Sequence, residues 1–229
     1  MSDLLKVKVG GSSYLCRWEP TSVKVENVRF LLNGKTVTDQ PSEGSISQYK
    51  SDDTFPIENL PIINKSDITS GGVYFTNDFI SHCMNGTKEF TLDFWFKGIS
   101  HNRNYTPYFI GFSRLNNNDY MLTTNYSDDL SNFLFPPFFH TGLDRFYMEK
   151  NKWHHIAAQF KPNGSRAETS LYIDGTLVDT PTTFYPSEGF YLKFNAQSNT
   201  DYSLGQICIR EGIVWTSDFT PPTMRYIPA

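Results

Sequence analysis

The chain has 229 residues, a net charge of −4 and a sequence pI of about 5.7, and none of its basic runs exceeds two residues. Nucleic-acid binding depends on clustered Lys and Arg, so this composition argues against a nucleic-acid partner. No apolar stretch approaches the roughly 20 residues of a membrane helix, and the N-terminus lacks the features of a signal peptide. Aromatic residues make up 16% of the chain, which favours a β-rich domain large enough to bury a sizeable core.

Two β-hairpins are predicted near the N-terminus, because strand-like runs flank two Gly-containing turns. The runs are 4–9 and 13–18 around Gly10-Gly11, then 23–32 and 35–38 around Asn33-Gly34. The polar, turn-rich segment 38–50 is predicted to be a linker. The hairpins form either an N-terminal extension at 1–45, ahead of a β-domain at 46–229, or the first strands of that domain.

Residues 90–96 (FTLDFWF) predict a strand with two unlike faces. Successive side chains on a strand point to opposite sides of the sheet. One face would hold Phe90, Leu92, Phe94 and Phe96, and the other Thr91, Asp93 and Trp95. The first of these faces is apolar throughout, as expected for a core.

Residues 153–179 predict an antiparallel meander, since short alternating runs are separated by turn residues. The first run alternates Ile156, Ala158 and Phe160 with His155, Ala157 and Gln159. This alternation is typical of a strand with one buried face. Pro162-Asn163-Gly164 ends that run, and Asp174-Gly175 forms a second turn after the strand at 169–173.

The residues that commonly bind metals do not form a recognisable His or Cys site. His154 and His155 are neighbours on a strand, so their side chains point to opposite faces. We expect one ring to pack near Trp153 or to hydrogen-bond a neighbouring loop, and the other to be exposed. Cys16, Cys83 and Cys208 are expected to be buried, reduced thiols, because no C-x₂-C pair or nearby Cys–His pair accompanies them.

The segments WHHIAA (153–158) and LYIDG (171–175) resemble the signature of laminin G-like modules in the concanavalin A-like lectin/glucanase superfamily. The strand at 90–96 and the C-terminal YSLGQICI and VWTSDFTPPT are similar to further strands and a tail in that family. The resemblance covers roughly residues 62–223. It implies an all-β fold, a concanavalin A-like jelly-roll β-sandwich of two antiparallel sheets, of the kind found in phage tail and bacterial surface proteins.

Some relatives with this fold are enzymes. Laminarinase-type glucanases carry an E-x-D-x-E or E-x-D-x-x-E strand, and retaining glycosidases need two carboxyl groups about 5–5.5 Å apart. This chain has no such triplet: its nearest strand carboxylates, Glu168 and Asp174, are six residues apart, and Asp174 belongs to a turn. We therefore expect no enzymatic activity, and a glycoside hydrolase is the less favoured alternative.

The resemblance also raises the question of calcium, which some relatives hold on loops through Asp and Asn oxygens. Oxygen-rich loops occur at 116–119 and 125–129. The metal candidates are Asp119, Asp128 and Asp129. The same residue types dominate ordinary turns for local backbone reasons, so both interpretations stay open, and no other cofactor is expected.

A glycan site is expected in the Tyr- and Asn-rich region between Gly98 and His140. Aromatic rings stack on the apolar faces of sugars, while Asn and Arg hydrogen-bond to hydroxyls. The candidate ligand-binding residues are Arg103, Tyr105, Tyr108, Asn117, Tyr120 and Tyr126. The run 133–140 (FLFPPFFH) is either core beneath a long loop or part of an exposed platform.

These observations predict a non-catalytic recognition module that binds a carbohydrate or another cell-surface ligand within a phage tail or bacterial surface assembly. The alternative is a structural virion component whose sandwich packs against partner chains. The expected partners are a glycan or host-surface ligand, other virion proteins and further copies of the chain, with neither nucleic acid nor membrane insertion. The expected location is the virion or the extracellular space, reached after removal of a leader or through virion assembly and host lysis.

Overall fold

The computed structural model describes residues 4–9, 12–17, 22–33, 45–58, 60–69, 72–75, 88–101, 108–114, 122–123, 148–164, 166–180, 182–184, 190–194 and 200–229. Regular structure in these ranges is almost entirely β-strand, together with the 3₁₀ helix η1 (Lys65–Asp67). No helix in these ranges has the length and hydropathy that crossing a membrane requires. The predicted all-β fold is confirmed.

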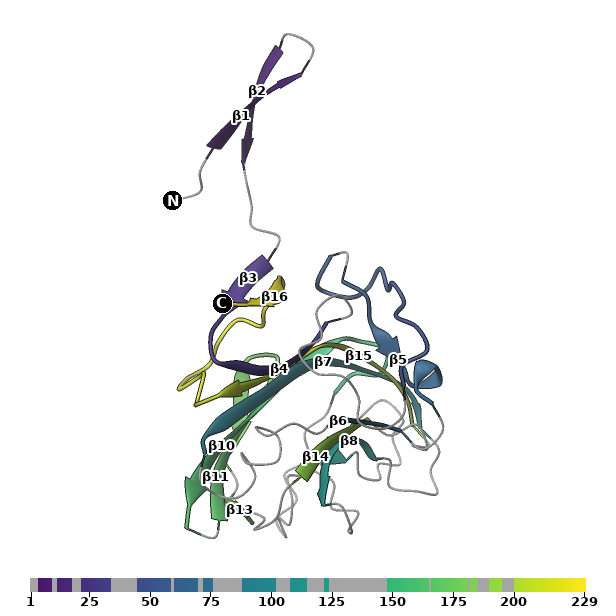
Figure 1. Cartoon of the computed structure of the whole chain (residues 1–229), viewed down its shortest axis with the longest axis vertical. Coiled ribbons are helices and arrows are strands. Elements are labelled where there is room, and N and C mark those ends of the chain that lie inside the picture. Colours follow the sequence, from purple (N-terminus) through teal and green to yellow (C-terminus); the bar gives the residue numbers. More distant parts are fainter. Residues whose placement is uncertain are drawn as a thin grey trace.

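A large, curved antiparallel sheet runs through the molecule in the order β12–β11–β10–β7–β15–β4 (Figure 1). Two short strands add to it, since β13 pairs with β11 and β5 pairs with β15. The bounds are β4 (Val28–Leu32), β5 (Ile63–Asn64), β7 (Phe90–His101), β10 (His154–Asn163), β11 (Arg166–Ile173), β12 (Thr176–Asp179), β13 (Thr182–Phe184) and β15 (Thr200–Glu211). The predicted meander is present as β10, β11 and β12.

A smaller antiparallel sheet, in the order β6–β14–β8–β9, faces the concave side of the large sheet (Figure 1). Its strands are β6 (Val73–Phe75), β8 (Tyr108–Arg114), β9 (Leu122–Thr123) and β14 (Phe190–Phe194). Between the two sheets lies the main core, in which Phe75 and Phe194 of the small sheet pack with Phe94 and Phe96 of the large one. The predicted β-sandwich of two antiparallel sheets is therefore confirmed.

The two-faced strand at 90–96 is β7, and its faces are those predicted. Phe90, Leu92, Phe94 and Phe96 all lie in the main core. On the opposite side, which we call the outer face, Thr91 and Asp93 are fully buried and Trp95 is nearly so. A covering layer must therefore lie over the outer face of the large sheet.

Strand β10 departs from the prediction of one buried face. Residues 154–160 are buried on both sides, including the outer residues His155, Ala157 and Gln159. The prediction was wrong because a strand pattern does not reveal a distant segment that covers its polar side. One such segment is the C-terminal residues 213–229, and the other is residues 45–69.

The predicted hairpin at Gly10-Gly11 is confirmed as β1 (Leu4–Val9) and β2 (Ser12–Arg17), which pair with each other as a separate two-stranded sheet. The predicted single strand at 23–32 is instead broken. Its halves are β3 (Ser22–Val25) and β4, separated by Asn27 at a φ of 55°. β4 joins the large sheet beside β15, whereas residues 35–38 lie outside the described residues.

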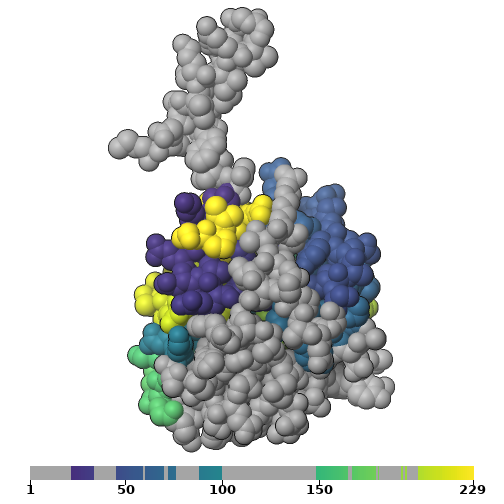
Figure 2. Space-filling model, in the orientation of Figure 1, coloured from purple at the N-terminus to yellow at the C-terminus, as the bar shows by residue number. Residues whose placement is uncertain are grey.

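Strand β3 pairs in parallel with β16 (Arg225–Pro228), near the C-terminus of the chain. Residues 22–33 and the C-terminal segment consequently lie side by side on the surface, in purple and yellow in Figure 2. Val25 and Tyr226 of these strands bury a small core with Leu31 and Cys208. Cys208 is buried and free, as predicted, whereas the side chains of Cys16 and Cys83 lie outside the described residues.

The turn at Asp174-Gly175 is confirmed, and it also docks the C-terminal segment. Both turn residues have positive φ, 52° and 80°. The backbone N–H of Phe219 donates to the carbonyl of Gly175 at 2.9 Å. A Cβ at Gly175 would lie 1.8 Å from the carbonyl oxygen of Phe219, so the approach requires glycine for space as well as for conformation.

Replacing Gly175 by Ala should therefore destabilise the fold more than the same change at Gly164. Gly164 also has positive φ, 63°, but a Cβ there meets nothing within 4 Å. We expect Gly164→Ala to cost about 1 kcal/mol of unfolding free energy from backbone strain alone. Gly175→Ala should cost at least about 2 kcal/mol more, measured by urea unfolding. Equal costs would contradict the close packing of the C-terminal segment on this turn.

Candidate functional site

A polar cluster lies on the outer face of the large sheet, and strand register brings it together. In neighbouring strands β10, β7 and β15, Ala157, Asp93 and Cys208 occupy one row. In the next row Gln159 stands opposite Thr91, which stands opposite Arg210. Residues far apart in sequence thus share one surface, and the short side chains beside Asp93 leave space above the sheet for longer ones.

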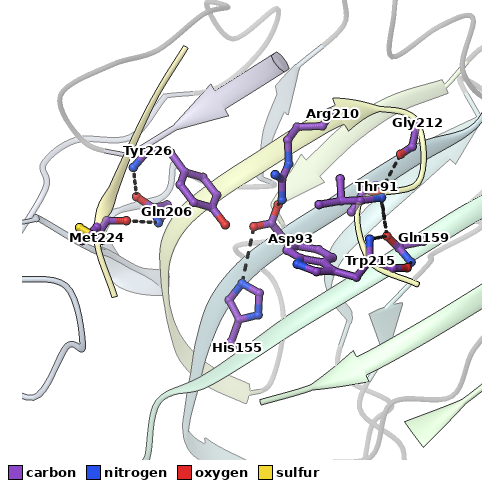
Figure 3. Close-up of polar contacts among 11 residues, drawn as sticks. Thr91, Asp93, His155, Gln159, Gln206, Arg210, Gly212, Trp215, Met224 and Tyr226 are labelled. Atoms are coloured by element: carbon purple, nitrogen blue, oxygen red, sulfur yellow. Dashed lines mark hydrogen bonds and ion pairs between the residues drawn. The ribbon is translucent and has the colours of Figure 1, made fainter. Parts of the chain in front are cut away.

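Asp93 is the negative centre of this cluster (Figure 3). Its carboxylate Oδ1 accepts a hydrogen bond from Arg210 Nη2 at 3.1 Å, and its Oδ2 lies 3.5 Å from His155 Nε2. The second distance is longer than a normal hydrogen bond, so Arg210 is the stronger partner. Burial acts to lower the pKa of Arg210, but the neighbouring Asp93 carboxylate raises that pKa above its ordinary value.

Trp215 of the C-terminal segment closes this cluster from above. Its ring stacks on Phe219, with centroids 4.0 Å apart and an interplanar angle of 9°. The guanidinium of Arg210 lies 4.9 Å from the Trp215 centroid, in cation–π contact. His155 has Trp95, Trp215 and Phe219 around its ring at 5.2 to 6.1 Å. Trp215 is therefore engaged by Phe219 and Arg210 and is not a free platform for a sugar ring.

Two glutamines of the sheet hold the backbone of the C-terminal segment (Figure 3). Gln159 Oε1 accepts the N–H groups of Val214 and Trp215 at 2.8 and 2.7 Å, and its Nε2 donates to the Trp215 carbonyl at 2.6 Å. Gln206 binds the segment in the same way nearer its C-terminal end. Its Oε1 accepts the Tyr226 N–H at 2.7 Å, and its Nε2 donates to the Met224 carbonyl at 3.1 Å. These side-chain amides supply the donors and acceptors that a neighbouring strand would supply in a ladder.

The other half of the outer face is covered by residues 45–69. Phe55 packs on Trp153 and Trp95, with centroids 4.6 and 6.2 Å away. It fills the space left by Gly205, where a Cβ would lie 2.4 Å from the Phe55 ring. Lys97 forms an ion pair with Asp52 of this segment and lies 5.1 Å from the Trp153 centroid. Both halves of the outer face are thus engaged in packing.

His154 is held at the start of β10 by the Asp174 turn. Its Nδ1 lies 2.7 Å from Asp174 Oδ2, and Asp174 Oδ1 accepts the backbone N–H of His155 at 2.9 Å. An ionised carboxylate only accepts hydrogen bonds, so Nδ1 carries the proton. Burial acts to raise the pKa of Asp174, but these hydrogen bonds and the nearby histidines lower it below its ordinary value.

The prediction that one of the two histidines is exposed was wrong, because the exposed fractions of His154 and His155 are 7% and 1%. A carboxylate beside an imidazole is a common catalytic pair, but Asp93 and His155 lie beneath aromatic rings and away from solvent. The described residues contain no cluster of three or more metal-ligating side chains of the His, Cys, Asp and Glu types. The outer-face cluster therefore serves to fix the C-terminal segment.

The residues predicted to bind ligand or metal lie outside the described residues, apart from Tyr108. They are Arg103, Tyr105, Asn117, Asp119, Tyr120, Tyr126, Asp128 and Asp129. Tyr108 is the first residue of β8, whose backbone alone is described there. The neighbouring strands show where the chain leaves each sheet. It leaves the large sheet after His101, the last residue of β7, and the small sheet after Arg114, the last residue of β8.

Sequence reasoning missed the outer-face cluster. Asp93 and Gln159 stand at alternate positions opposite the apolar faces of their predicted strands, and no local pattern links them to Arg210. The sequence does contain one indication of this packing, the aromatic pair Trp215 and Phe219 in a Pro-rich tail. Large aromatic side chains in a segment without strand periodicity indicate that the segment packs on something.

Removing Arg210 should be costly, because it leaves the Asp93 carboxylate buried without its cation. We expect Arg210→Met to lower the unfolding free energy by about 3–5 kcal/mol in urea titrations. The double variant Arg210→Met/Asp93→Leu should be more stable than Arg210→Met, since no unpaired charge remains.

The matched control is Arg29→Met, because Arg29 pairs with Glu211 at the surface and its side chain is 48% exposed. Exposed ion pairs contribute little, so a loss below about 1 kcal/mol is expected. If Arg210→Met and Arg29→Met cost the same, or if the double variant at 93 and 210 is less stable than Arg210→Met, the buried pair does not have the role described.

The lowered pKa of Asp174 predicts a pH dependence of stability. A folded-state pKa below the unfolded one stabilises the fold above about pH 4, and this contribution is lost as the pH falls through the folded-state value. Asp174→Asn removes it. The difference in unfolding free energy between the wild type and Asp174→Asn should therefore shrink between pH 5 and the acid limit of folding, followed by urea unfolding at several pH values. A difference independent of pH would contradict the assignment.

Comparison with known proteins matches this architecture. The family model described as the concanavalin A-like lectin/glucanases superfamily matches residues 67–207, more than half of the chain. No curated protein sequence matches. Trypanosoma rangeli sialidase in complex with sialic acid superposes with a TM-score of 0.52 at 13% identity, over 82% of this chain and 31% of the sialidase.

The binding domain of botulinum neurotoxin serotype D/C superposes with a TM-score of 0.50 at 15% identity, over 82% of this chain and 50% of that chain. The botulinum neurotoxin DC binding domain in complex with rat synaptotagmin II gives a TM-score of 0.50 at 12% identity, over 82% and 49%. This chain spans about a third to a half of these proteins, and identities this low show the fold alone. With the family model and the curved sandwich in agreement, the chain belongs to the concanavalin A-like lectin/glucanase superfamily.

Proposed function

We propose that this chain is a non-catalytic recognition module that binds a carbohydrate through the segments joining its strands between Gly98 and His140. The observation that carries the proposal is that both faces of β7, and of β10 from His154 to Phe160, are engaged in packing. The inner face of these strands lines the main core, and the outer face lies beneath residues 45–69 and 213–229. The strand ends are therefore more accessible to a ligand than either face of β7 or β10.

The segments that join the strands have the composition of a carbohydrate site. Between His101 and Tyr108 lie Arg103 and Tyr105, and after Arg114 come further Asn and Tyr residues. Aromatic rings and planar hydrogen-bonding groups together suit the alternating apolar and hydroxyl faces of a sugar. Two strand ends, His101 of the large sheet and Tyr108 of the small one, bound the first of these segments.

The inner face of the large sheet argues against glycoside hydrolysis. Retaining and inverting glycosidases need two carboxyl groups flanking the bond that breaks. On the inner face of β7 and β10, the positions from Phe90 to Phe96 and from Ile156 to Phe160 carry Phe, Leu, Ile and Ala. These side chains fill the space between the sheets and leave no room there for a polysaccharide.

The comparisons support a carbohydrate ligand at the level of the superfamily, which includes lectins. One solved neighbour is a sialidase in complex with sialic acid, so a sialylated glycan is a natural first probe. Another neighbour is in complex with a protein, synaptotagmin II, which keeps a protein ligand as an outcome of the test. A phage tail or bacterial surface setting, in the virion or outside the cell, is part of this proposal.

A glycan array with the full chain, followed by calorimetry on the best ligand, tests the proposal. Tyr105→Ala and Tyr108→Ala should each weaken binding by at least about tenfold, the equivalent of about 1.4 kcal/mol. The matched control is Leu177→Ala, an exposed apolar side chain on β12, which should leave the affinity unchanged. The calcium interpretation is tested by repeating the titration with a chelator, both for the wild type and for a variant with Asp119, Asp128 and Asp129 changed together to Asn. Calcium binding is supported if the chelator weakens glycan binding by the wild type but not by the triple variant.

Three outcomes would contradict the proposal. If broad substitution of residues 102–129 leaves the glycan affinity unchanged, the glycan does not bind at the proposed site. Turnover of a β-glucan or a sialoside would overturn the non-catalytic assignment. Absence of binding to every glycan, with tight binding to a protein receptor, would replace the carbohydrate by a protein ligand.

A further inference from the structure

The tight turn between β10 and β11 carries an Asn-Gly pair at the surface of the molecule. Asn163 is the last residue of β10 and stands opposite Arg166, the first residue of β11. Gly164 follows in the turn with a φ of 63°. Asn163 and Gly164 are both exposed. The turn explains why these residues are there, but neither contributes to the core, to the outer-face cluster or to the proposed glycan site.

An asparagine followed by glycine can lose its side-chain amide without an enzyme. The backbone nitrogen of the glycine, after giving its proton to hydroxide, attacks the side-chain Cγ of the asparagine. A C–N bond forms, the bond from Cγ to Nδ2 breaks, and Nδ2 takes up a proton and leaves as ammonia. Water then opens the resulting succinimide at either carbonyl, giving aspartate or isoaspartate. Glycine favours the attack because it has no Cβ to hinder a close approach of the backbone.

The same dipeptide occurs at 33–34, where the asparagine has the opposite surroundings. Asn33 is 1% exposed, and its Nδ2 donates a buried hydrogen bond to the Tyr226 carbonyl at 2.9 Å. Attack on its Cγ would pull the amide away and leave that buried carbonyl without this donor, which is costly. The fold therefore protects Asn33. A third Asn-Gly pair, at 85–86, lies outside the described residues.

Asn163 has no comparable protection. Its Nδ2 donates to Glu168 Oε1 at 2.9 Å, but this hydrogen bond is exposed, so water replaces either partner at little cost. A Cβ placed on Gly164 would meet nothing within 4 Å, so no packed neighbour confines the turn on that side. The side chain of Asn163 and the backbone of Gly164 can therefore move into the geometry of attack, and water reaches the succinimide that forms.

We propose that Asn163 is a site of spontaneous deamidation, whereas the fold keeps Asn33 intact. Each event adds a negative charge at the tip of the β10–β11 hairpin. The new carboxylate faces Glu168 where the amide donated before, so a hydrogen bond is replaced by like-charge repulsion across the strand pair. The isoaspartate product also lengthens the backbone at the residue that pairs with Arg166. The proposal does not depend on the proposed function.

The test follows both asparagines in one sample. The full chain is incubated at mildly alkaline pH, and peptide mapping by mass spectrometry measures the conversion of each asparagine over time. We expect Asn163 to convert at least about tenfold faster than Asn33, a difference of about 1.4 kcal/mol in the barrier. In denaturing urea the two rates should agree within about twofold, because both asparagines precede glycine and the protection by the fold is gone.

Gly164→Ala tests the mechanism, since its Cβ enters open space but hinders the attack on Asn163. It should slow the conversion of Asn163 by at least about tenfold, while Asn33 in the same sample reports that the variant stays folded. The wild-type comparison stands whatever the variant does. Equal rates for the two asparagines in the native chain, an Asn163 that stays intact, or a rate difference that persists in urea would each overturn the proposal.

Discussion

The structure depends on how the outer face of the large sheet is closed. Asp93 and Arg210 form a buried ion pair on that face, beneath Trp215. A buried charge is tolerated only when it is paired and shielded from water. The segment that shields it is tied down by Gln159 and Gln206, whose amides bond to its backbone. The polar strand residues and the C-terminal segment therefore require each other.

The closure of the outer face also brings the two ends of the sandwich together. The segment that covers the outer face ends in β16, and β16 pairs with β3, the first strand of the sandwich. The N–H of the last residue, Ala229, donates to the carbonyl of Val25 at 3.0 Å. The two ends of the sandwich therefore meet, and β3 and the C-terminal strand belong to the same side of the domain.

The same closure leaves little of the central strands accessible to a ligand. In the central strands β7 and β10, the inner face is packed with Phe and Ile side chains and the outer face from His154 to Phe160 lies beneath two chain segments. The polar cluster resembles a catalytic pair only in its residue types, since His155 and Asp93 are out of contact with solvent. This is why the proposed function assigns recognition to the segments between strands, where sequence can vary without disturbing either packed face.

The sequence by itself determined the strands and the fold. The alternation in FTLDFWF and the meander from Trp153 onward are local patterns, and each predicts a strand because the period of two is set by backbone geometry alone. It also determined the Asp174-Gly175 turn, since positive φ at both positions favours such residues. Only the tertiary structure decided that His155, Gln159 and Asp93 are buried, that β3 and β4 part at Asn27, and that the C-terminal segment crosses the sheet. Those outcomes rest on contacts between residues far apart in the chain, such as Val214 with Gln159, 55 positions apart, and Asn33 with Tyr226, 193 positions apart, which no local pattern encodes.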